Sequence, residues 1–485
     1  MPTSSHGWNL DHSYAALPDV FFRAQSPTAV EQAEVVLFNE ALAEELGLSP
    51  LSSDFKAQAA LLSGNQLPDG AQPIAQAYAG HQFGHFTMLG DGRAILLGEQ
   101  LTPDGRRFDI QLKGAGRTPF SRRGDGRATL SSMLREYLMS EAMYHLGIPS
   151  SRSLAVVATG EKVYRQPVQA GAVLTRVASS HLRVGTFEFA KRFGDEDALR
   201  ALTAYALQRH YPDLKDDERP ALALLRAVKD RQLDLIVEWM RVGFIHGVMN
   251  TDNMGIAGET FDYGPCAFMN GYDPATVFSS IDTHGRYAFS RQPGIAHWNL
   301  AVLASALLPI IDEDEDTALD LVRAVIDEFA DGFTERWFRM QFNKLGLQGT
   351  VEYDKKLVED LLQLMHRHLA DYTNTYLALR REQLPEGPLG LDPDFKHWFG
   401  RWTKRLNQQE DRAAALALMA QNNPVRIARN HLVEAALDAA VVGNMQPFHQ
   451  LLRDLRQPYH DSENELAFQA VPAGFDDVYK TYCGT

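Results

Sequence analysis

The sequence predicts an α+β protein with two lobes, a strand-rich lobe followed by a helical one, and an extension at each end. Residues 77–185 contain short apolar runs separated by glycine-containing turns, which is typical of antiparallel strands. Residues 186–400 place apolar side chains at helical spacing. The extensions are residues 1–76 and 401–485. The length suggests about three ordinary domains, and one two-lobed protein with extensions is equally natural for it.

The composition is that of a globular protein with an acidic balance. Of the 485 residues, 45% are hydrophobic and 22% are charged, which allows a sizeable core. The 47 Lys and Arg residues against 62 Asp and Glu residues give a net charge of −15, which disfavours nucleic acid and anionic membranes as partners. Two cysteines, no signal-peptide pattern and no apolar stretch long enough to span a bilayer favour a cytoplasmic location.

In the first half of the chain, the patterns predict helices over residues 29–46 and 129–146. Asp91-Gly92 and Asp104-Gly105 indicate hairpin turns between apolar runs. Strands are expected over residues 108–113, 154–158, 162–165 and 172–177.

The second half is predicted to be mainly helical. The expected helices cover residues 196–210, 220–242, 294–308, 315–333, 351–383, 411–420 and 425–441. A connector rich in proline and glycine is expected over 384–400, and a loose tail over 479–485.

A polar loop over residues 244–255, followed by the segment 261–264, is the most informative stretch. His-Gly, then Asp-Asn, then Asp-Tyr-Gly is close to the order in kinase-like phosphotransferases, where one Asp handles the acceptor proton while an Asn and a second Asp hold the metal. Because Mg²⁺ prefers hard oxygen ligands, Asn253 and Asp262 are candidate ligands, and Asp252 is the candidate base.

This loop departs from the protein-kinase pattern at one point. Gly247-Val248 stands where Arg-Asp is usual, and the acid instead lies directly beside Asn253. A solvated turn is the alternative interpretation, since Asn and Asp favour turns.

Lys113, at the end of an expected strand, is a candidate phosphate-binding residue. Glu136 follows in the next helix, and an ion pair between the two would match the pair that positions the lysine in kinases. The alternatives are an exposed lysine at a strand end and a solvated glutamate.

Residues 114–127 are rich in glycine and arginine, which suits phosphate oxygens. Arg176 and Arg183 offer further guanidinium groups. The alternative for residues 114–127 is a flexible surface loop, and the alternative for Arg176 and Arg183 is salt bridges between the lobes. For His81 and His85 a structural role is expected, because no third metal ligand is evident nearby.

Taken together, these motifs resemble the selenoprotein O family of kinase-fold protein adenylyltransferases over nearly the whole chain. The motifs that carry the resemblance are Gly90-Asp91-Gly92-Arg93, Gln111-Leu112-Lys113-Gly114, Arg123-Gly124-Asp125-Gly126, Arg176 with Arg183, residues 246–253 and Phe261-Asp262-Tyr263-Gly264.

The resemblance implies ATP bound in a flipped orientation and transfer of AMP to Ser, Thr or Tyr hydroxyls of proteins. It implies Asp252 as base and a metal, Mg²⁺ or alternatively Mn²⁺, on Asn253 and Asp262. The implied nucleotide-binding residues are Gly90, Gly92, Arg93, Lys113, Asp125, Gly126, Arg176, Arg183 and Asp262.

Two other functions stay open at this point. One is a kinase that transfers the γ-phosphate. The other is a non-catalytic, nucleotide-binding pseudokinase scaffold, which the missing His-Arg-Asp acid suggests.

Cys266 follows the second acid closely, on what is expected to be a mobile loop beside the metal site, and Cys483 lies near the C-terminus. Two free thiols are the default in a reducing cytosol. If the tail folds back, a Cys266–Cys483 disulfide would tether it over the active-site loop and make activity depend on redox state.

Overall fold

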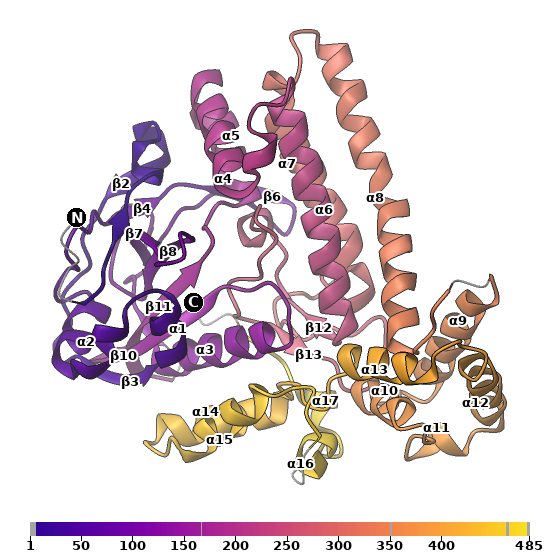
Figure 1. Ribbon diagram of the computed structural model, residues 1–485. Helices are drawn as coiled ribbons and strands as arrows, with labels where there is room; N and C mark the ends of the chain where they lie inside the picture. The colour runs from indigo at the N-terminus through magenta and orange to yellow at the C-terminus, as the bar shows by residue number, and fades with distance from the viewer. Residues whose placement is uncertain (1–5, 166, 350–351, 462–464, 483–485) are drawn as a thin grey trace.

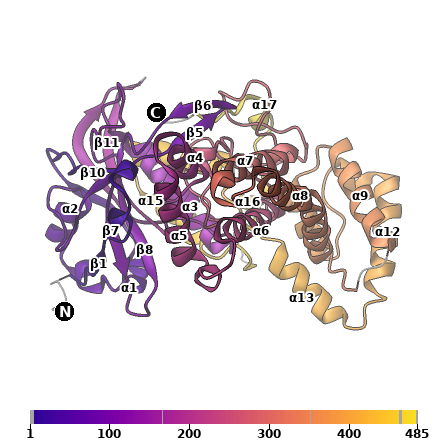
Figure 2. The ribbon, with the colours of Figure 1, turned by 90° about the horizontal axis from the view of Figure 1, so that it is seen from above.

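The structure is a computed structural model and describes residues 6–165, 167–349, 352–461 and 465–482. A large antiparallel sheet lies at one end of the molecule. The long helices of residues 184–344 lie in the middle, and helices from residues 352–422 lie at the opposite end (Figures 1 and 2). The α+β class is therefore confirmed as a mixed architecture of a large sheet and many helices.

In the described residues the large sheet has the strand order β2-β4-β7-β8-β11-β10-β3, with β1 paired to β7 and β9 paired to β11. The neighbouring strands are antiparallel. A separate two-stranded hairpin is formed by β5 and β6. The bounds are β1 Leu10–Asp11, β2 Phe22–Ala24, β3 Glu34–Phe38, β4 Ile74–Gln76, β5 Ala79–Gln82, β6 His85–Met88, β7 Ala94–Leu101, β8 Arg107–Lys113, β9 Ala128–Thr129, β10 Arg152–Val163 and β11 Gln169–Ala178.

Both faces of the sheet are buried, because its strands alternate between two hydrophobic cores. Ile95 and Leu97 of β7 belong to the core beneath α1 (Glu40–Glu45) and α2 (Phe55–Leu62). Leu96, between them, belongs to the main core, which also receives α3 (Leu130–His145). This arrangement makes the sheet a rigid platform for polar side chains at its strand ends.

The helical part begins with α4 (Val184–Phe193), α5 (Glu196–His210) and α6 (Pro220–Arg241). A short strand pair, β12 (Phe244–Ile245) and β13 (Ala267–Phe268), brackets the polar loop. The chain then forms α7 (Gln292–Leu307) and α8 (Glu315–Lys344). The later helices are α9 Glu352–Arg367, α10 Tyr372–Arg380, α11 Pro388–Leu391, α12 Pro393–Leu406, α13 Arg412–Asn422, α14 Asn430–Val441, α15 Gln446–Leu455, α16 Glu465–Gln469 and α17 Phe475–Val478.

The expectation that no apolar stretch is long enough to span a bilayer is wrong by length and composition alone, because one described helical stretch, Phe289–Ile310, meets both criteria. Its helix α7 packs against α4, α6 and α8. Gln292 in this helix donates to the carbonyl of Phe244, and Asn299 donates to the carbonyl of Met249. The helix α7 therefore lies among the other long helices, and its hydrogen bonds hold the polar loop over residues 244–255.

The helix predicted over residues 29–46 is wrong in its first half. Residues 34–38 form β3, which pairs with β10, and only Glu40–Glu45 is helical. Val35 and Val36 are β-branched and suit a strand, so pairing with β10 outweighs the helical spacing. The Asn39 side chain accepts from the backbone of Leu42 and starts the helix.

The Asp91-Gly92 hairpin is also wrong, because β6 and β7 belong to different sheets. The Asp104-Gly105 turn is confirmed between β7 and β8. The expected strands over 154–158 and 162–165 are one strand, β10, with a register shift near Ala158.

Part of the predicted connector over 384–400 is helical. Phe395, Trp398 and Trp402 form one buried stripe of α12, because their spacing of three and four residues places them on one helix face. The helix expected over 351–383 is broken near Leu369, which has a φ of 44°. The tail is not loose as far as it is described, since Thr481 is buried and donates to the carbonyl of Pro265 at 2.7 Å.

Candidate active site

The sheet presents a group of polar side chains near the end of two adjacent strands. Leu174 of β11 lies opposite Lys113 of β8, and Arg176 lies opposite Gln111. Side chains two residues apart on a strand share a face, so Gln111, Lys113 and Arg176 point the same way. The guanidinium of Arg176 donates to the Gln111 side-chain oxygen at 2.6 Å, which fixes its orientation.

The predicted ion pair between Lys113 and Glu136 is confirmed. The Lys113 Nζ donates to Glu136 Oε2 at 2.6 Å, and both side chains are buried. Glu136 comes from α3, which packs on β10 and β11. Arg176 Nη1 also reaches Glu136 Oε1 at 3.3 Å, so one carboxylate orients two cations.

Asp262 is the point on which three cations converge. Its Oδ1 accepts from Lys113 Nζ at 2.6 Å and from Arg176 Nη1 at 2.7 Å, and its Oδ2 lies 3.5 Å from Arg183 Nη1. Burial acts to raise the pKa of Asp262, but Lys113, Arg176 and Arg183 together hold this pKa well below its usual value. The three cations therefore favour the ionised form of Asp262.

The backbone at Asp262 adopts a left-handed conformation, with φ of 63°. Aspartate tolerates this region better than most residues. Beside it, the Tyr263 hydroxyl is hydrogen-bonded to the Ser150 hydroxyl, which anchors the turn to the connection between α3 and β10. The anchored turn directs the Asp262 carboxylate toward the three cations.

Asp252 lies in a short 3-10 turn, Thr251–Asn253, that packs against β5 and α4. Its side chain is buried, and its Oδ1 has no hydrogen-bond partner in the described part of the chain. Burial raises the pKa of Asp252 to about 7, although Arg183 acts in the opposite direction. A carboxylate with a pKa near neutrality is suited to accept a proton.

The strand β5 and the helix α4 enclose Asp252 on two sides. A side chain at Gly80 would collide with Asp252 Oδ1, and one at Gly185 would collide with the carbonyl of Ala79. Arg183, at the start of α4, donates to the Asp252 carbonyl at 2.8 Å. These close approaches require the two glycines and hold Asp252 in place.

His246 connects the segment before Asp262 to the loop before Asp252 through hydrogen bonds to the backbone. Its Nε2 donates to the carbonyl of Phe261 at 3.1 Å, while its Nδ1 accepts from the backbone of Val248. Burial lowers the pKa of His246, which is consistent with this neutral tautomer. The side-chain amide nitrogen of Asn253 donates a hydrogen bond to the Val248 carbonyl at 3.0 Å, which leaves the amide oxygen as an acceptor.

The glycine-rich segment at residues 90–93 packs closely against residues 118–121. A side chain at Gly90 would enter the ring of Phe120, and Gly90 has a φ of 124°. The carbonyl of Gly92 accepts from the Ser121 hydroxyl. Gly90 is thus required by both its backbone conformation and its packing against Phe120.

Asp125 is not brought into direct contact with the cluster around Asp262 by any described interaction. Its carboxylate is paired with Arg165 through two hydrogen bonds of 2.9 and 3.0 Å. Gly126 lies against Gly116, where a side chain would collide with the backbone. Arg93 is partly buried at the start of the β7 segment.

The cluster also includes three residues that were not predicted as site residues, namely Tyr78, Asp91 and Gln111. Asp91 accepts from the backbone of Gln76 and from Gln111, and burial raises its pKa to about 6. The ring of Tyr78 lies 4.1 Å from the Arg183 guanidinium carbon. Asp91 and Gln111 lie inside motifs that carry the family resemblance, so the sequence could have indicated them as site residues. Tyr78 lies in none of these motifs, and only the folded structure places it at the site.

The structural role expected for His81 is confirmed, since its Nδ1 pairs with the buried carboxylate of Glu188. His85 is exposed. No group of three or more His, Cys, Asp or Glu side chains arranged for a metal occurs among the described residues.

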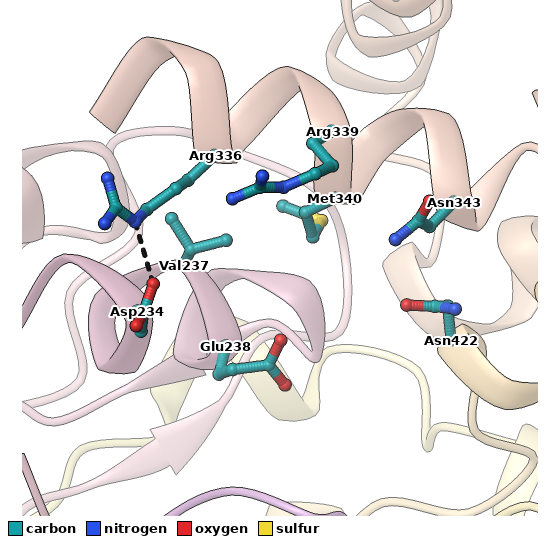
Figure 3. Close-up of a pocket in the computed structure, with 8 residues that line it drawn as sticks. All are labelled: Asp234, Val237, Glu238, Arg336, Arg339, Met340, Asn343 and Asn422. Carbon is teal, nitrogen blue, oxygen red and sulfur yellow. Dashed lines mark hydrogen bonds and ion pairs between the residues drawn. The ribbon is translucent and has the colours of Figure 1, made fainter. Parts of the chain in front are cut away.

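A hollow of about 200 Å³ lies between α6 and α8, beside Asn422 (Figure 3). Arg336 points across it to Asp234 and also pairs with Asp230. The charge of this arginine is therefore neutralised within the helix pair, and the hollow contains none of the predicted site residues.

Cys266 is fully buried, and burial raises the pKa of its thiol to about 12. The expectation that it lies on a mobile loop is wrong, because Cys266 is packed in the core directly before β13. Cys483 lies outside the described residues, so the default of two free thiols and the alternative of a Cys266–Cys483 disulfide both stay untested. Arg135 donates to the Cys266 carbonyl at 2.7 Å and lies beside the Tyr479 hydroxyl, which places the described end of the tail near Cys266.

Comparison with known proteins is decisive for the family. The model of the family described as protein adenylyltransferase SelO matches residues 7–456. The chain belongs to the SelO family. It is 54% identical to a protein nucleotidyltransferase YdiU from Nitrosococcus oceani, with 99% of this chain and 98% of that protein aligned.

Other members of the family are equally similar along their whole length. The YdiU protein of Halalkalibacterium halodurans is 53% identical, with 100% of this chain and 99% of that protein aligned. That of Bacillus mycoides is 53% identical, with 99% of each chain aligned. The family match therefore covers both the sheet and the helical part, including every residue of the cluster.

Proposed function

We propose that this protein transfers AMP from ATP to serine, threonine or tyrosine hydroxyls of other proteins. The observation that carries the proposal is the convergence of Lys113, Arg176 and Arg183 on Asp262, next to the buried carboxylate of Asp252. Membership of a family of protein adenylyltransferases supports this chemistry. The proposal includes a kinase-like arrangement of two lobes and a cytoplasmic location.

In this proposal the three cations bind phosphate oxygens when ATP is present. Arginine forks and a lysine ammonium are suited to phosphate, and Gln111 and Glu136 already orient them. The segment containing Gly90, Gly92 and Arg93, together with Asp125 and Gly126, supplies further nucleotide contacts. The cations then stabilise the charge that develops at the α-phosphate in the transition state.

Asp252 acts as the base. The hydroxyl oxygen of the protein substrate attacks the α-phosphorus, its proton passes to the Asp252 carboxylate, and the bond to pyrophosphate breaks. Arg183 contacts both the Asp252 carbonyl and the Asp262 carboxylate, so it links the base to the phosphate-binding group.

The donor set fits a divalent cation such as Mg²⁺, with Mn²⁺ as the alternative. Asp262 offers a carboxylate whose ionised form is favoured by its lowered pKa, and Asn253 offers an amide oxygen whose orientation is fixed by the bond to Val248. A metal bound there would neutralise charge on the phosphates.

Two labelled forms of ATP test the proposed function. With ATP labelled at the α-phosphate, label should become attached to protein, and with ATP labelled at the γ-phosphate it should not. Protein labelled from the γ position alone would identify a kinase. Nucleotide binding without transfer of either label would identify a pseudokinase scaffold.

Lys113→Met should reduce transfer more than Glu136→Gln does. Loss of the lysine removes a phosphate contact, with an expected fall in kcat/KM of about 100-fold, typical of the loss of one charge-stabilising donor. In Glu136→Gln, Lys113 keeps its bond to Asp262, so we expect a smaller loss. Steady-state rates at varied ATP concentration measure both effects, and equal losses would contradict the positioning role of Glu136.

A further inference from the structure

A groove of about 360 Å³ opens beside the active site, between the β5–β6 hairpin, α4 and α7. Its walls include Phe86 of the hairpin, Arg192 of α4, and Val302 and Ala306 of α7. None of these residues belongs to the cluster around Asp262.

The walls of this groove are also the elements that enclose Asp252. The backbone of His81, in the hairpin, donates to the Thr251 hydroxyl at 2.8 Å. Gly80 lies directly against the Asp252 carboxylate, and α4 packs on the Thr251–Asn253 turn. A chain that occupies the groove therefore passes close to the base.

Exposed apolar side chains gather at Phe86, which lines the groove, and at its neighbours. Phe86 is 40% exposed, Met88, two residues further along β6, is 53% exposed, and Phe193 is 44% exposed. The ring centroids of Phe86 and Phe193 are 6.5 Å apart. The ring of Phe193 packs on the ring of Phe189, with 4.9 Å between the ring centroids. Large apolar side chains exposed together in this way are typical of a binding surface.

The charge at the mouth of the groove is positive, although the chain carries a net charge of −15. The Arg192 guanidinium carbon lies 5.5 Å from the centre of the Phe86 ring. Lys191 is exposed and bonded to the carbonyl and hydroxyl of Ser305, so its charge is not met by a carboxylate there. The acid within the groove, Glu188, is buried and paired with His81.

We propose that this groove docks an extended segment of the protein substrate, with an apolar side chain against Phe86 and acidic residues beside Arg192. The inference rests on the proposed function, because it takes the occupant to be the substrate of that reaction. Apolar contact supplies affinity, and the positive rim selects acidic segments.

The test uses three synthetic peptides with one tyrosine each. The first contains a leucine flanked by two glutamates, the second replaces the glutamates by lysines, and the third replaces the leucine by serine. Binding of fluorescently labelled peptide is measured by anisotropy without ATP. Wild type should bind the first peptide most tightly.

Arg192→Glu should weaken binding of the glutamate peptide about tenfold and strengthen binding of the lysine peptide. The gain for the lysine peptide distinguishes a changed surface from misfolding, because a misfolded variant gains no specific affinity. Phe86→Ser should remove the preference for leucine over serine. Arg200→Glu, an exposed arginine on α5 that pairs with Glu196, is the matched control and should bind like wild type.

Unchanged peptide preference in Arg192→Glu would overturn the docking site. Self-association that is lost in Phe86→Ser would also overturn it, because a second copy of this chain would then be the occupant. The two proposals are separated by transfer measurements. AMP transfer with the same KM for peptide in wild type and Arg192→Glu rejects the docking site alone, whereas groove binding without any transfer from α-labelled ATP rejects the proposed function.

Discussion

Asp252→Asn should lower the rate of AMP transfer by about 10²–10⁴-fold, the usual contribution of a general base. Asparagine has nearly the same shape as aspartate but cannot accept the proton. The phosphate-binding cations contact Asp262 and Glu136 through bonds that this change leaves intact. ATP affinity, measured by calorimetry, should therefore stay close to that of wild type.

The same variant should be more stable to heat than wild type, and the gain should be larger at pH 8 than at pH 5. Burial raises the pKa of Asp252 from an ordinary 3.8 to about 7, so the folded state favours the neutral form. As pH rises from about 4 to about 7, the wild-type fold loses stability, since the unfolded chain ionises more readily. Asparagine is neutral at every pH and avoids this cost.

Melting temperatures in the presence of a chelator and without ATP measure this difference. Asp331→Asn, which changes an exposed aspartate on α8, is the control and should show no such pH dependence. A gain in melting temperature that is equal at both pH values would contradict the buried, weakly solvated state of Asp252. Near-normal transfer by Asp252→Asn would show that another group is the base.

Asp262→Ala should abolish transfer and also destabilise the protein. The change removes the common partner of Lys113, Arg176 and Arg183, which leaves three neighbouring cations to repel one another. Removal of one partner from a buried ion pair lowers the free energy of unfolding by about 3–5 kcal/mol. Because Asp262 is partly exposed, we expect a loss of about 3 kcal/mol.

Denaturant unfolding and transfer assays at saturating ATP separate the two effects. Asp262→Asn is the matched variant, because it keeps a hydrogen-bond acceptor for Lys113 but loses the charge that would hold a metal. It should be more stable than Asp262→Ala and equally inactive. Substantial activity in Asp262→Asn would count against the metal-binding role of this residue.

Where a helix depends on local spacing, the sequence predicted it well. The range expected for α5 matches its observed bounds, and α3 and α6 agree within one residue at each end. These helices carry regular apolar faces and recognisable ends, which are local properties. Residues 34–38 could not be predicted in this way, because their strand exists only through pairing with β10.

The sequence by itself determined the family of the protein and the set of motifs that contains the candidate site. The motifs that contain Lys113, Asp252 and Asp262 carried the resemblance together with the glycine-rich motifs and the two arginines, because only their combination is specific. Only the tertiary structure decided that Lys113, from 149 residues away, and Arg176, from 86 residues away, share one oxygen of Asp262. Only burial by β5 and α4 gave Asp252 a pKa near 7, because desolvation depends on neighbours that are distant along the chain.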